Sequence, residues 1–170
     1  MEVSAVASSA RVLDPELRLQ HALDLAFRYL TRRDRTELEM RRYLEDKRVE
    51  PGAIEAALTH LREHGYLDDA RFAQRFAEDR RLLDEWGADR IERRLLTVGV
   101  PADLARDAVA TRGPGGELQA ACALLRHRFP ALGDDPSERR RACGVLVRKG
   151  YDVELAWEAI RAHAGGEIGW

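Results

Sequence analysis

The sequence predicts an all-α protein of three tandem three-helix repeats that form an elongated, curved rod. The main observation is that apolar positions recur every 51 residues, within segments of helical spacing. Five sets coincide under this shift: Leu44, Leu95 and Leu146; Val49, Val100 and Tyr151; Ile54, Ala105 and Ala156; Ala57, Ala108 and Ala159; and Leu58, Val109 and Ile160. A constant period over three copies indicates units that bury their apolar faces on one another. No segment alternates apolar and polar residues for long enough to predict a strand.

The first repeat is expected over residues 16–66. Apolar residues at helical spacing predict its first helix, and Asp34 followed by Glu37 suggests a capping box at the start of the second. Pro51 then predicts the start of a third helix and Gly65 its end. Proline suits the first turn of a helix, and glycine suits the position just after one.

The second repeat is expected over residues 67–112. Asp68 or Asp69 can cap its first helix, Gly87 interrupts that helix, and Pro101 begins the last helix of the repeat. Adjacent residues at a helix start face different ways. We therefore interpret the two aspartates as caps that interact with the helix dipole, not as paired catalytic carboxylates.

A Gly/Pro linker is expected over residues 113–116, because the run Gly-Pro-Gly-Gly is a poor continuation of a helix. The third repeat follows over residues 117–164, with Asp135 as the N-cap of its second helix and Gly150 at the end of that helix. Such a flexible linker predicts a variable angle between the third repeat and the second.

The composition is typical of a globular chain, with 45% hydrophobic and 34% charged residues. No apolar run approaches the roughly 20 residues that span a bilayer, so no membrane contact is expected. Residues 1–15 lack the basic start and apolar stretch of a secretory signal, and they are expected, like residues 165–170, to be tails. Cys122 and Cys143 lie in apolar helical patterns, which predicts buried thiols in a reducing, cytoplasmic compartment.

Positive charge gathers on the second helix of each repeat. The residues that we interpret as a surface for a partner or for DNA are Arg41, Arg42, Arg90, Arg93, Arg94, Arg139, Arg140, Arg141, Arg148 and Lys149. Such clusters can neutralise phosphates or contact an acidic protein rim, although a solvated helix face is the simpler explanation of any one of them. The net charge of −2 and the interspersed acidic residues predict that any DNA contact is weak and auxiliary.

One motif suggests metal chemistry. His60, Glu63 and His64 match the inverted zinc-protease pattern, which would place both imidazoles on one helix face. A hydrolytic zinc needs a third protein ligand and an open coordination position, and no further ligand motif accompanies this one. We therefore expect no metal, no cofactor and no catalytic residue, and a protein that is not an enzyme.

The repeats resemble the RecX family of recombination regulators over about residues 17–163. The most specific part is Gly65-Tyr66-Leu67-Asp68-Asp69 followed by Phe72, and we expect structural roles for these residues, with Tyr66 and Phe72 as keystones between the first two repeats. Weaker matches are Ala22, Leu23, Arg32, Arg33, Thr36, Glu37, Leu38, Leu58, Leu61, Arg71, Ala73, Gly87, Arg90, Ile91, Leu95, Gly99, Val100, Arg148, Lys149, Gly150 and Tyr151.

This resemblance implies a modulator, mainly an inhibitor, of the RecA recombinase. Proteins of the family bind RecA and lie along the groove of its filament on single-stranded DNA. They thereby limit filament growth, ATP hydrolysis, strand exchange and co-protease activity. A rod of repeats suits that role, because weak contacts along a helical polymer add through effective concentration. The expected protein is a cytoplasmic monomer whose partners are RecA and the RecA–single-stranded DNA filament.

Three alternatives stay open, of which the zinc hydrolase suggested by His60, Glu63 and His64 would be settled by a metal assay on protein purified without an affinity tag. Trihelical units with basic helices are also typical of stand-alone DNA-binding modules, and a helical array can be a scaffold for another partner. Tight, strongly salt-dependent binding of duplex DNA in the absence of RecA would favour the DNA-binding module.

The chain departs from the family pattern at Arg48, which aligns with Gly99 and Gly150. If the backbone is left-handed at these positions, a non-glycine residue costs on the order of 1 kcal/mol. The turn at Arg48 is therefore expected to close differently from the other two.

Overall fold

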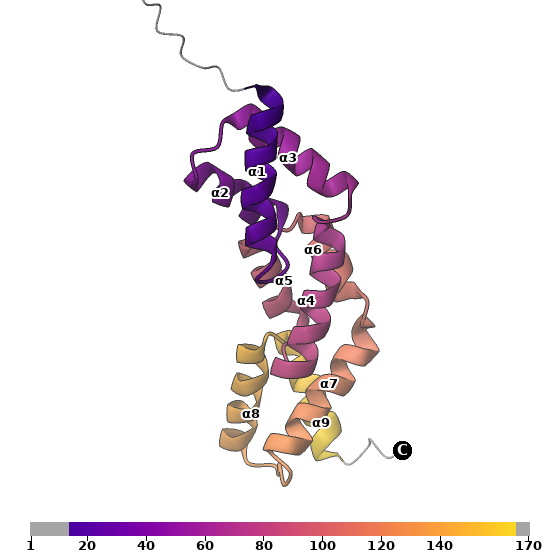
Figure 1. The fold of residues 1–170 in the computed structure, drawn as a ribbon. Coiled ribbons are helices and arrows are strands. Elements are labelled where there is room, and N and C mark those ends of the chain that lie inside the picture. Colours follow the sequence, from indigo (N-terminus) through magenta and orange to yellow (C-terminus); the bar gives the residue numbers. More distant parts are fainter. Residues whose placement is uncertain (1–13, 166–170) are drawn as a thin grey trace, which may run out of the picture. The chain divides into compact units, whose positions relative to one another are not determined.

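The computed structural model describes residues 14–165, so the expected tails lie almost wholly outside the described residues. Over this range the chain forms nine α-helices and no strand, which confirms the all-α prediction (Figure 1). The chain divides into two compact units, residues 1–67 and residues 68–170. None of the described helices is long and apolar enough to cross a bilayer.

The first unit contains α1 (Pro15–Leu30), α2 (Glu37–Asp46) and α3 (Pro51–Glu63). Helix α1 packs mainly against α3, and the three helices enclose one apolar cluster. Its fully buried large side chains are Met40, Leu44, Leu58 and Leu61. These residues come from α2 and α3, and two of them, Leu44 and Leu58, are positions that recur with the period of 51.

The second unit contains two further groups of three helices. The first group is α4 (Asp69–Asp84), α5 (Ala88–Thr97) and α6 (Ala102–Ala110), and the second is α7 (Gly113–Arg128), α8 (Pro136–Lys149) and α9 (Val153–Ala164). In each group the first helix packs mainly against the third, as in the first unit. Each group also has its own apolar cluster, so the three-helix repeat is seen three times.

The period of 51 residues corresponds to equivalent buried positions. Leu44, Leu95 and Leu146 are all fully buried. The same holds for the alanines of the third helices, which are Ala57, Ala108 and Ala159. These side chains lie where two helices of a repeat cross, and only a small or well-fitting apolar residue can occupy such a place. The predicted core is therefore confirmed for most of these positions, while Val49 and Val109 are half-buried at its edge.

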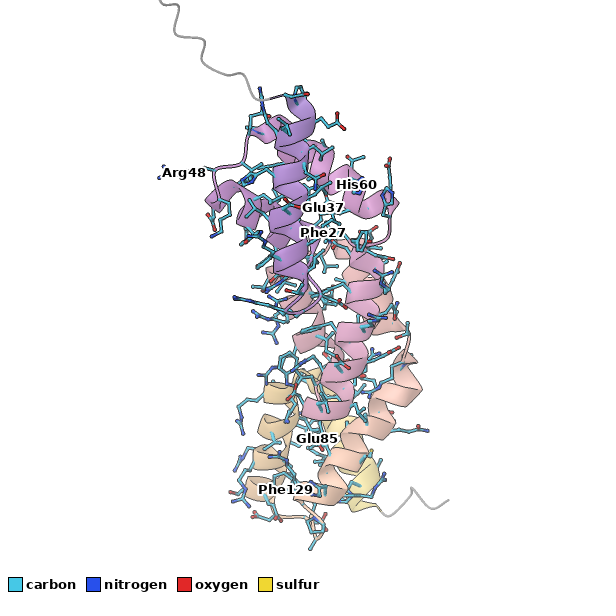
Figure 2. All side chains as sticks on the ribbon, in the orientation of Figure 1. Phe27, Glu37, Arg48, His60, Glu85 and Phe129 are labelled. Carbon is cyan, nitrogen blue, oxygen red and sulfur yellow. The ribbon has the colours of Figure 1, made fainter. Side chains whose placement is uncertain are left out.

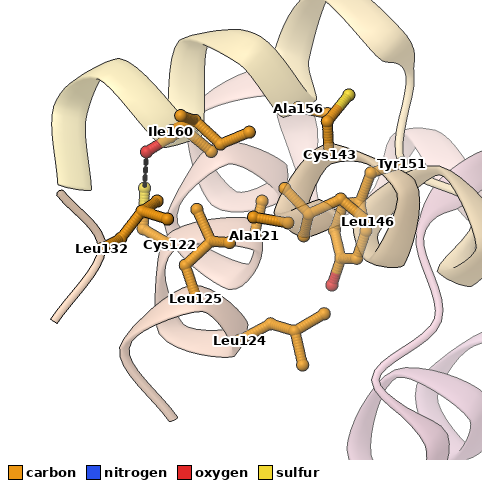
Figure 3. Close-up of a cluster of buried hydrophobic side chains, with 12 residues drawn as sticks. Ala121, Cys122, Leu124, Leu125, Leu132, Cys143, Leu146, Tyr151, Ala156 and Ile160 are labelled. Atoms are coloured by element: carbon orange, nitrogen blue, oxygen red, sulfur yellow. Dashed lines mark hydrogen bonds between the residues drawn. The ribbon is translucent and has the colours of Figure 1, made fainter. Parts of the chain in front are cut away.

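Figure 3 shows the cluster of the third repeat, in which Leu125, Leu146 and Ile160 approach one another from three different helices. Cys122 and Cys143 belong to this cluster and are free thiols, as predicted. Burial raises the pKa of both thiols, which keeps them protonated and poorly nucleophilic.

The start of α2 differs from the prediction. Thr36, not Asp34, is the N-cap: its hydroxyl accepts a hydrogen bond from the Glu39 N–H at 3.1 Å, and Glu39 accepts one from the Thr36 N–H at 3.3 Å. The capping box is therefore placed two residues later than expected. Thr36 is fully buried, so its hydroxyl has to be satisfied inside the protein, and this box does so.

The predicted linker at residues 113–116 is wrong, because these residues form the first turn of α7. Gly113 has a left-handed backbone with φ +68°, and Pro114 follows it in the first turn. Glycine thus allows the sharp change of direction after α6, and proline fixes the backbone for the next helix. The Gly-Pro run joins two helices directly, and it supplies no flexible spacer.

Arg48, Gly99 and Gly150 all have left-handed backbones, with φ of 59°, 91° and 94°. The expectation that the turn at Arg48 closes differently is wrong. In each of the three turns the next residue, at 49, 100 or 151, donates its N–H to the carbonyl five positions earlier. This bond is the Schellman arrangement, which satisfies a carbonyl at the end of a helix. The side chain of Arg48 is exposed and extends away from the helices (Figure 2).

Candidate partner-binding surface

The arginines of α2 differ in their surroundings. Arg41 forms ion pairs with Glu55 and with Glu37, the latter at 3.8 Å, and these pairs raise its pKa. Arg42 is exposed and has no ion-pair partner in the described part of the chain. The positive charge of Arg41 is thus largely compensated within the first repeat.

The basic residues of α8 are divided in the same way. Arg139 pairs with Asp134 and donates to the Gly133 carbonyl at 2.9 Å, while Arg141 lies 4.0 Å from Glu138. Arg140 and Arg148 are exposed and have no carboxylate partner among the described residues. Only part of the predicted cluster is therefore available to an external anion.

Helix α5 carries the largest group of arginines that lack carboxylate partners within residues 14–165. Arg90, Arg93 and Arg94 share one face of this helix, since their spacing of three and four residues brings them together. With Trp86 and Thr97 they line a shallow, open pocket of about 490 Å³. Guanidinium groups gathered in this way have the donor geometry and charge that suit phosphate or carboxylate groups.

Arg90 is the most firmly held of the three. Its guanidinium lies 4.2 Å from the centre of the Trp86 ring, and it donates a hydrogen bond to the Arg148 carbonyl at 3.0 Å. Arg93 donates from Nε to the Asp89 carbonyl at 3.2 Å, which leaves its two terminal nitrogens for a ligand. The Arg90 side of the pocket is thus rigid, while the guanidinium groups of Arg93 and Arg94 have more freedom to reorient toward a ligand.

The C-terminal end of α8 meets the N-terminal end of α5. The Gly87 N–H donates to the Lys149 carbonyl at 2.9 Å, and the Asp89 N–H donates to the Gly150 carbonyl at 3.1 Å. These are groups that a helix leaves without partners at its ends, so each helix satisfies the other. The negative end of α8 also faces the positive end of α5, which favours this arrangement.

The two backbones approach so closely that only glycine fits. A Cβ atom on Gly87 would lie 2.4 Å from the Gly150 carbonyl oxygen, and a Cβ atom on Gly150 would lie 2.3 Å from the Cβ of Arg90. The third repeat is therefore joined to the second by direct backbone contact, and a variable angle between the two repeats would require this contact to break.

Glu117 of α7 has a structural role at this junction that the sequence did not indicate. Its carboxylate accepts a hydrogen bond from the Ala88 N–H at 2.7 Å and lies 3.4 Å from Arg112. It thereby caps α5, which has no capping side chain of its own at Gly87. A helix that begins at glycine was the available signal, but the identity of the capping group depends on how α7 packs.

Lys149 belongs to the same junction. Its ammonium group donates to the Asp84 carbonyl at 2.6 Å and lies 3.7 Å from the Glu85 carboxylate, which Figure 2 labels. The Tyr151 hydroxyl donates to the Glu85 carbonyl at 3.3 Å. Burial and the nearby Glu117 raise the pKa of Tyr151 to about 12. Lys149 therefore fastens the end of α4 to the third repeat.

Arg81 was also missed, and its role is structural. It donates to the carbonyls of Ala108 and Val109 and to the Thr111 hydroxyl, so it satisfies the C-terminal end of α6. Burial, together with the positive charge of Arg112, lowers its pKa. Arg81 is consequently unavailable to a ligand although it lies on a helix rich in charge.

The segment from Gly65 to Phe72 is seen in detail. Gly65 has a left-handed backbone with φ +70°. The half-exposed Tyr66 ring packs edge-on against the Phe27 ring, with 5.0 Å between the ring centres. Leu67 is buried in the core of the first repeat. Asp68 caps α4 by accepting from the Arg71 N–H at 2.9 Å, and Asp69 lies in the first turn. Phe72 packs with Phe76 inside the second repeat. The structural roles of these residues agree with these contacts, and the keystone role of Tyr66 and Phe72 stays a prediction.

The rings of His60 and His64 stack at 4.0 Å, and His64 Nδ1 lies 2.8 Å from the His60 carbonyl. Nowhere in the described range do three or more side chains of ligand type converge on a point that could hold a metal ion. The spacing of the two histidines is thus explained by local contacts in the last turn of α3.

Comparisons with known proteins agree with this fold. Two family models match, RecX first three-helix domain over residues 22–61 and RecX second three-helix domain over residues 68–109. A regulatory protein RecX from Deinococcus radiodurans is 37% identical over 82% of this chain and 66% of its own length, and one from Chromohalobacter salexigens is 36% identical over 83% and 91%. The crystal structure of RecX from Lactobacillus salivarius superposes with a TM-score of 0.78 at 16% identity, covering 87% of this chain and 97% of that one, and shows the shared fold. The chain therefore belongs to the RecX family of regulatory proteins.

Proposed function

We propose that this chain regulates the RecA recombinase, mainly as an inhibitor, and that it acts as a non-enzymatic cytoplasmic binder of RecA and its filament on single-stranded DNA. The observation that supports this best is the membership of the RecX family together with a face of α5 on which three arginines lack carboxylate partners within the described chain. A filament of RecA on DNA offers both phosphate groups and acidic side chains to such a face.

The junction between the second and third repeats supports this role. It orients α5, because the Lys149 and Gly150 carbonyls and the Glu117 carboxylate satisfy the N–H groups at its start. A site on a helix that is fixed in this way loses little conformational entropy on binding. Several repeats in one chain can then contact successive subunits of a polymer, so that individually weak contacts add. Occupation of the groove would limit filament growth, ATP hydrolysis, strand exchange and co-protease activity.

The direct experiment measures ATP hydrolysis by RecA on single-stranded DNA with increasing amounts of the purified chain. We expect inhibition at a few micromolar or below. Absence of inhibition over that range, by protein whose helical content is intact, would count decisively against the proposal.

The double substitution Arg93→Ala and Arg94→Ala tests the surface. It removes two exposed charges without touching the contacts of Arg90, and it should raise the half-inhibitory concentration about tenfold. The matched control is Arg106→Ala with Arg126→Ala, which removes two exposed arginines elsewhere in the same unit. Arg106, like Arg93, donates from Nε to the carbonyl four residues earlier. Equal effects of the two doubles would show that only total charge matters.

The remaining alternative is a stand-alone DNA-binding module. In that case the chain alone would bind duplex DNA tightly, with an affinity that falls steeply as salt rises. Under our proposal the affinity of the free chain for duplex DNA is weak, and binding becomes tight only when RecA is present.

A further inference from the structure

The last turn of α4 carries two exposed leucines. Leu82 is 81% exposed and Leu83 is 70% exposed, whereas no other large hydrophobic side chain in the described residues exceeds 59%. A single exposed leucine is ordinary on a protein surface. Two adjacent ones at this level of exposure form an apolar projection that the fold itself does not use.

Helical geometry explains the exposure. Helix α4 buries Ala73 and Ala77 on the side that packs against α6. Leu82 lies nine residues after Ala73, and at about 100° per residue it faces the opposite side of the helix. Packing within the repeat therefore gives no reason for a leucine there, and a polar residue would serve the fold better.

The turn that carries the two leucines is held in place on both sides. Arg80 pairs with Asp84, and Lys149 of the third repeat donates to the Asp84 carbonyl at 2.6 Å. The next residue, Glu85, is left-handed with φ 56° and accepts at its carbonyl from the Tyr151 hydroxyl. The projection is consequently rigid, and ordering it on binding costs little.

The charge next to the leucines is acidic. Glu78 and Asp79 lie one turn earlier on the same side of α4, are exposed, and have no lysine or arginine within ion-pair distance in the described chain. The guanidinium of Arg80 is turned toward Asp84 and Trp86, and that of Arg81 toward the end of α6. The leucine pair therefore has two carboxylates without ion pairs on its side toward the start of α4, whereas on the other side the Glu85 carboxylate lies 3.7 Å from Lys149 and 3.9 Å from Arg128.

We propose that Leu82 and Leu83, with Glu78 and Asp79, form a docking surface for a protein partner that offers an apolar pocket bordered by lysine or arginine side chains. Charge complementarity selects this occupant, because the Glu78 and Asp79 carboxylates repel the phosphates of a nucleic acid and attract a basic protein rim. This inference rests on the proposed function, under which the partner is a RecA subunit. The leucine surface of α4 then contacts protein, and the arginine face of α5 contacts anionic groups.

The test compares four forms of the full-length chain for binding to RecA assembled on single-stranded DNA. The forms are the wild type, Leu82→Ser with Leu83→Ser, Glu78→Lys with Asp79→Lys, and the control Leu17→Ser with Val153→Ser. The control residues are also exposed apolar side chains, at 59% and 51%. All the substituted residues lie on the surface, so folding should be preserved, and far-ultraviolet circular dichroism checks this.

We expect the leucine double to weaken binding about tenfold or more, as loss of a central apolar anchor does. The lysine double should weaken it severalfold, and the control should stay within about twofold of the wild type. If the wild type binds and the leucine double binds equally well, this inference fails while the proposed function stands. If the lysine double binds more tightly, the occupant is a nucleic acid and the inference is overturned. If the wild type does not bind RecA, the proposed function and the inference about the leucine surface are both refuted.

Sedimentation of the chain alone completes the test. A monomeric wild type supports an external partner for the leucine surface. A wild-type dimer that the leucine double disperses would mean that a second copy of the chain occupies this surface, which would also overturn the inference.

Discussion

At the scale of single residues, the turns at 48, 99 and 150 show one backbone geometry with different side chains. The left-handed conformation at each position places the next N–H on a carbonyl of the preceding helix. Glycine adopts it without strain, and arginine does not. Arg48 is therefore a site where the first repeat carries strain that the other two repeats avoid.

We expect Arg48→Gly to raise the free energy of unfolding by about 1 kcal/mol, because it relieves the left-handed strain. The side chain of Arg48 is exposed, so little packing is lost. Urea denaturation followed by circular dichroism measures the change. Arg48→Ala keeps the strain and should leave the stability almost unchanged; a gain as large as that of the glycine variant would refute the explanation.

Tyr151 provides a prediction for alkaline pH. Its pKa in the folded protein is raised to about 12, above its usual value, because burial and then the nearby Glu117 disfavour the phenolate. A raised pKa means that the contribution of the neutral phenol to stability is complete below the usual tyrosine pKa. That contribution is then lost as the pH rises through the folded value.

Tyr151→Phe removes this titration. Between about pH 10 and about pH 12 the wild type should therefore lose more stability than the variant, as measured by urea midpoints at each pH. Tyr66→Phe, which removes a half-exposed phenol from the surface, is the control and should follow the wild type. Parallel pH profiles for wild type and Tyr151→Phe would show that the phenol is not linked to folding.

At the scale of elements, the decisive contact is the one between the end of α8 and the start of α5. Gly87 has φ −82° and ψ 169°, a conformation that any residue adopts. The space, and not the backbone conformation, requires glycine, since a Cβ would lie 2.4 Å from the Gly150 oxygen and 2.6 Å from the Tyr151 nitrogen.

Gly87→Ala should therefore lower the free energy of unfolding by about 2 kcal/mol, through overpacking against a backbone that cannot move aside. Gly144→Ala is the matched control. It lies inside α8, and the nearest atom to its Cβ would be the flexible end of Arg148 at 3.2 Å. Alanine is the better helix former, so this control should gain about 1 kcal/mol. The two substitutions should therefore change the free energy of unfolding in opposite directions. No change for Gly87→Ala would mean that the two backbones do not pack tightly at this junction.

At the scale of the whole molecule, residues 68–170 form one compact unit that contains two repeats, and residues 1–67 form the other. A unit joined by backbone contacts should open as one in solution. The arginine face of α5 therefore depends on the correct folding of the third repeat, although α5 and α8 lie far apart along the chain.

Amide hydrogen exchange followed by mass spectrometry tests this organisation. In wild type, peptides from α5 and α8 should become exposed with the same apparent free energy. Gly87→Ala should accelerate exchange in both helices together and leave α1 to α3 unchanged. Acceleration confined to α5, or spread equally over the first unit, would contradict the division into these two units.

Much of the fold could be predicted because it depends on local patterns. Equivalent side chains such as Leu44, Leu95 and Leu146 repeat at a constant spacing, and helix starts such as Pro51 and Asp135 follow from backbone and capping preferences. The error at residues 113–116 has the same origin. A glycine and a proline that end one helix and begin the next have the same composition as a linker.

The candidate surface was less predictable. The ten basic residues were visible in the sequence, but their ion pairs were not. Arg41 and Arg139 are compensated by Glu55 and Asp134, whereas Arg93 and Arg94 are not compensated in the described chain. Glu55 lies on another helix and Asp134 in a loop, so the charge that remains available depends on packing.

The sequence by itself determined the all-helical class, the three-helix repeat and most of the core, because each follows from the order of residues along one or two helices. Only the tertiary structure decided that α8 satisfies the start of α5, that Glu117 caps it, and that Leu82 and Leu83 remain exposed. The physical reason is that hydrogen-bond partners at helix ends, and the burial of a side chain, are properties of neighbours that lie far apart along the chain.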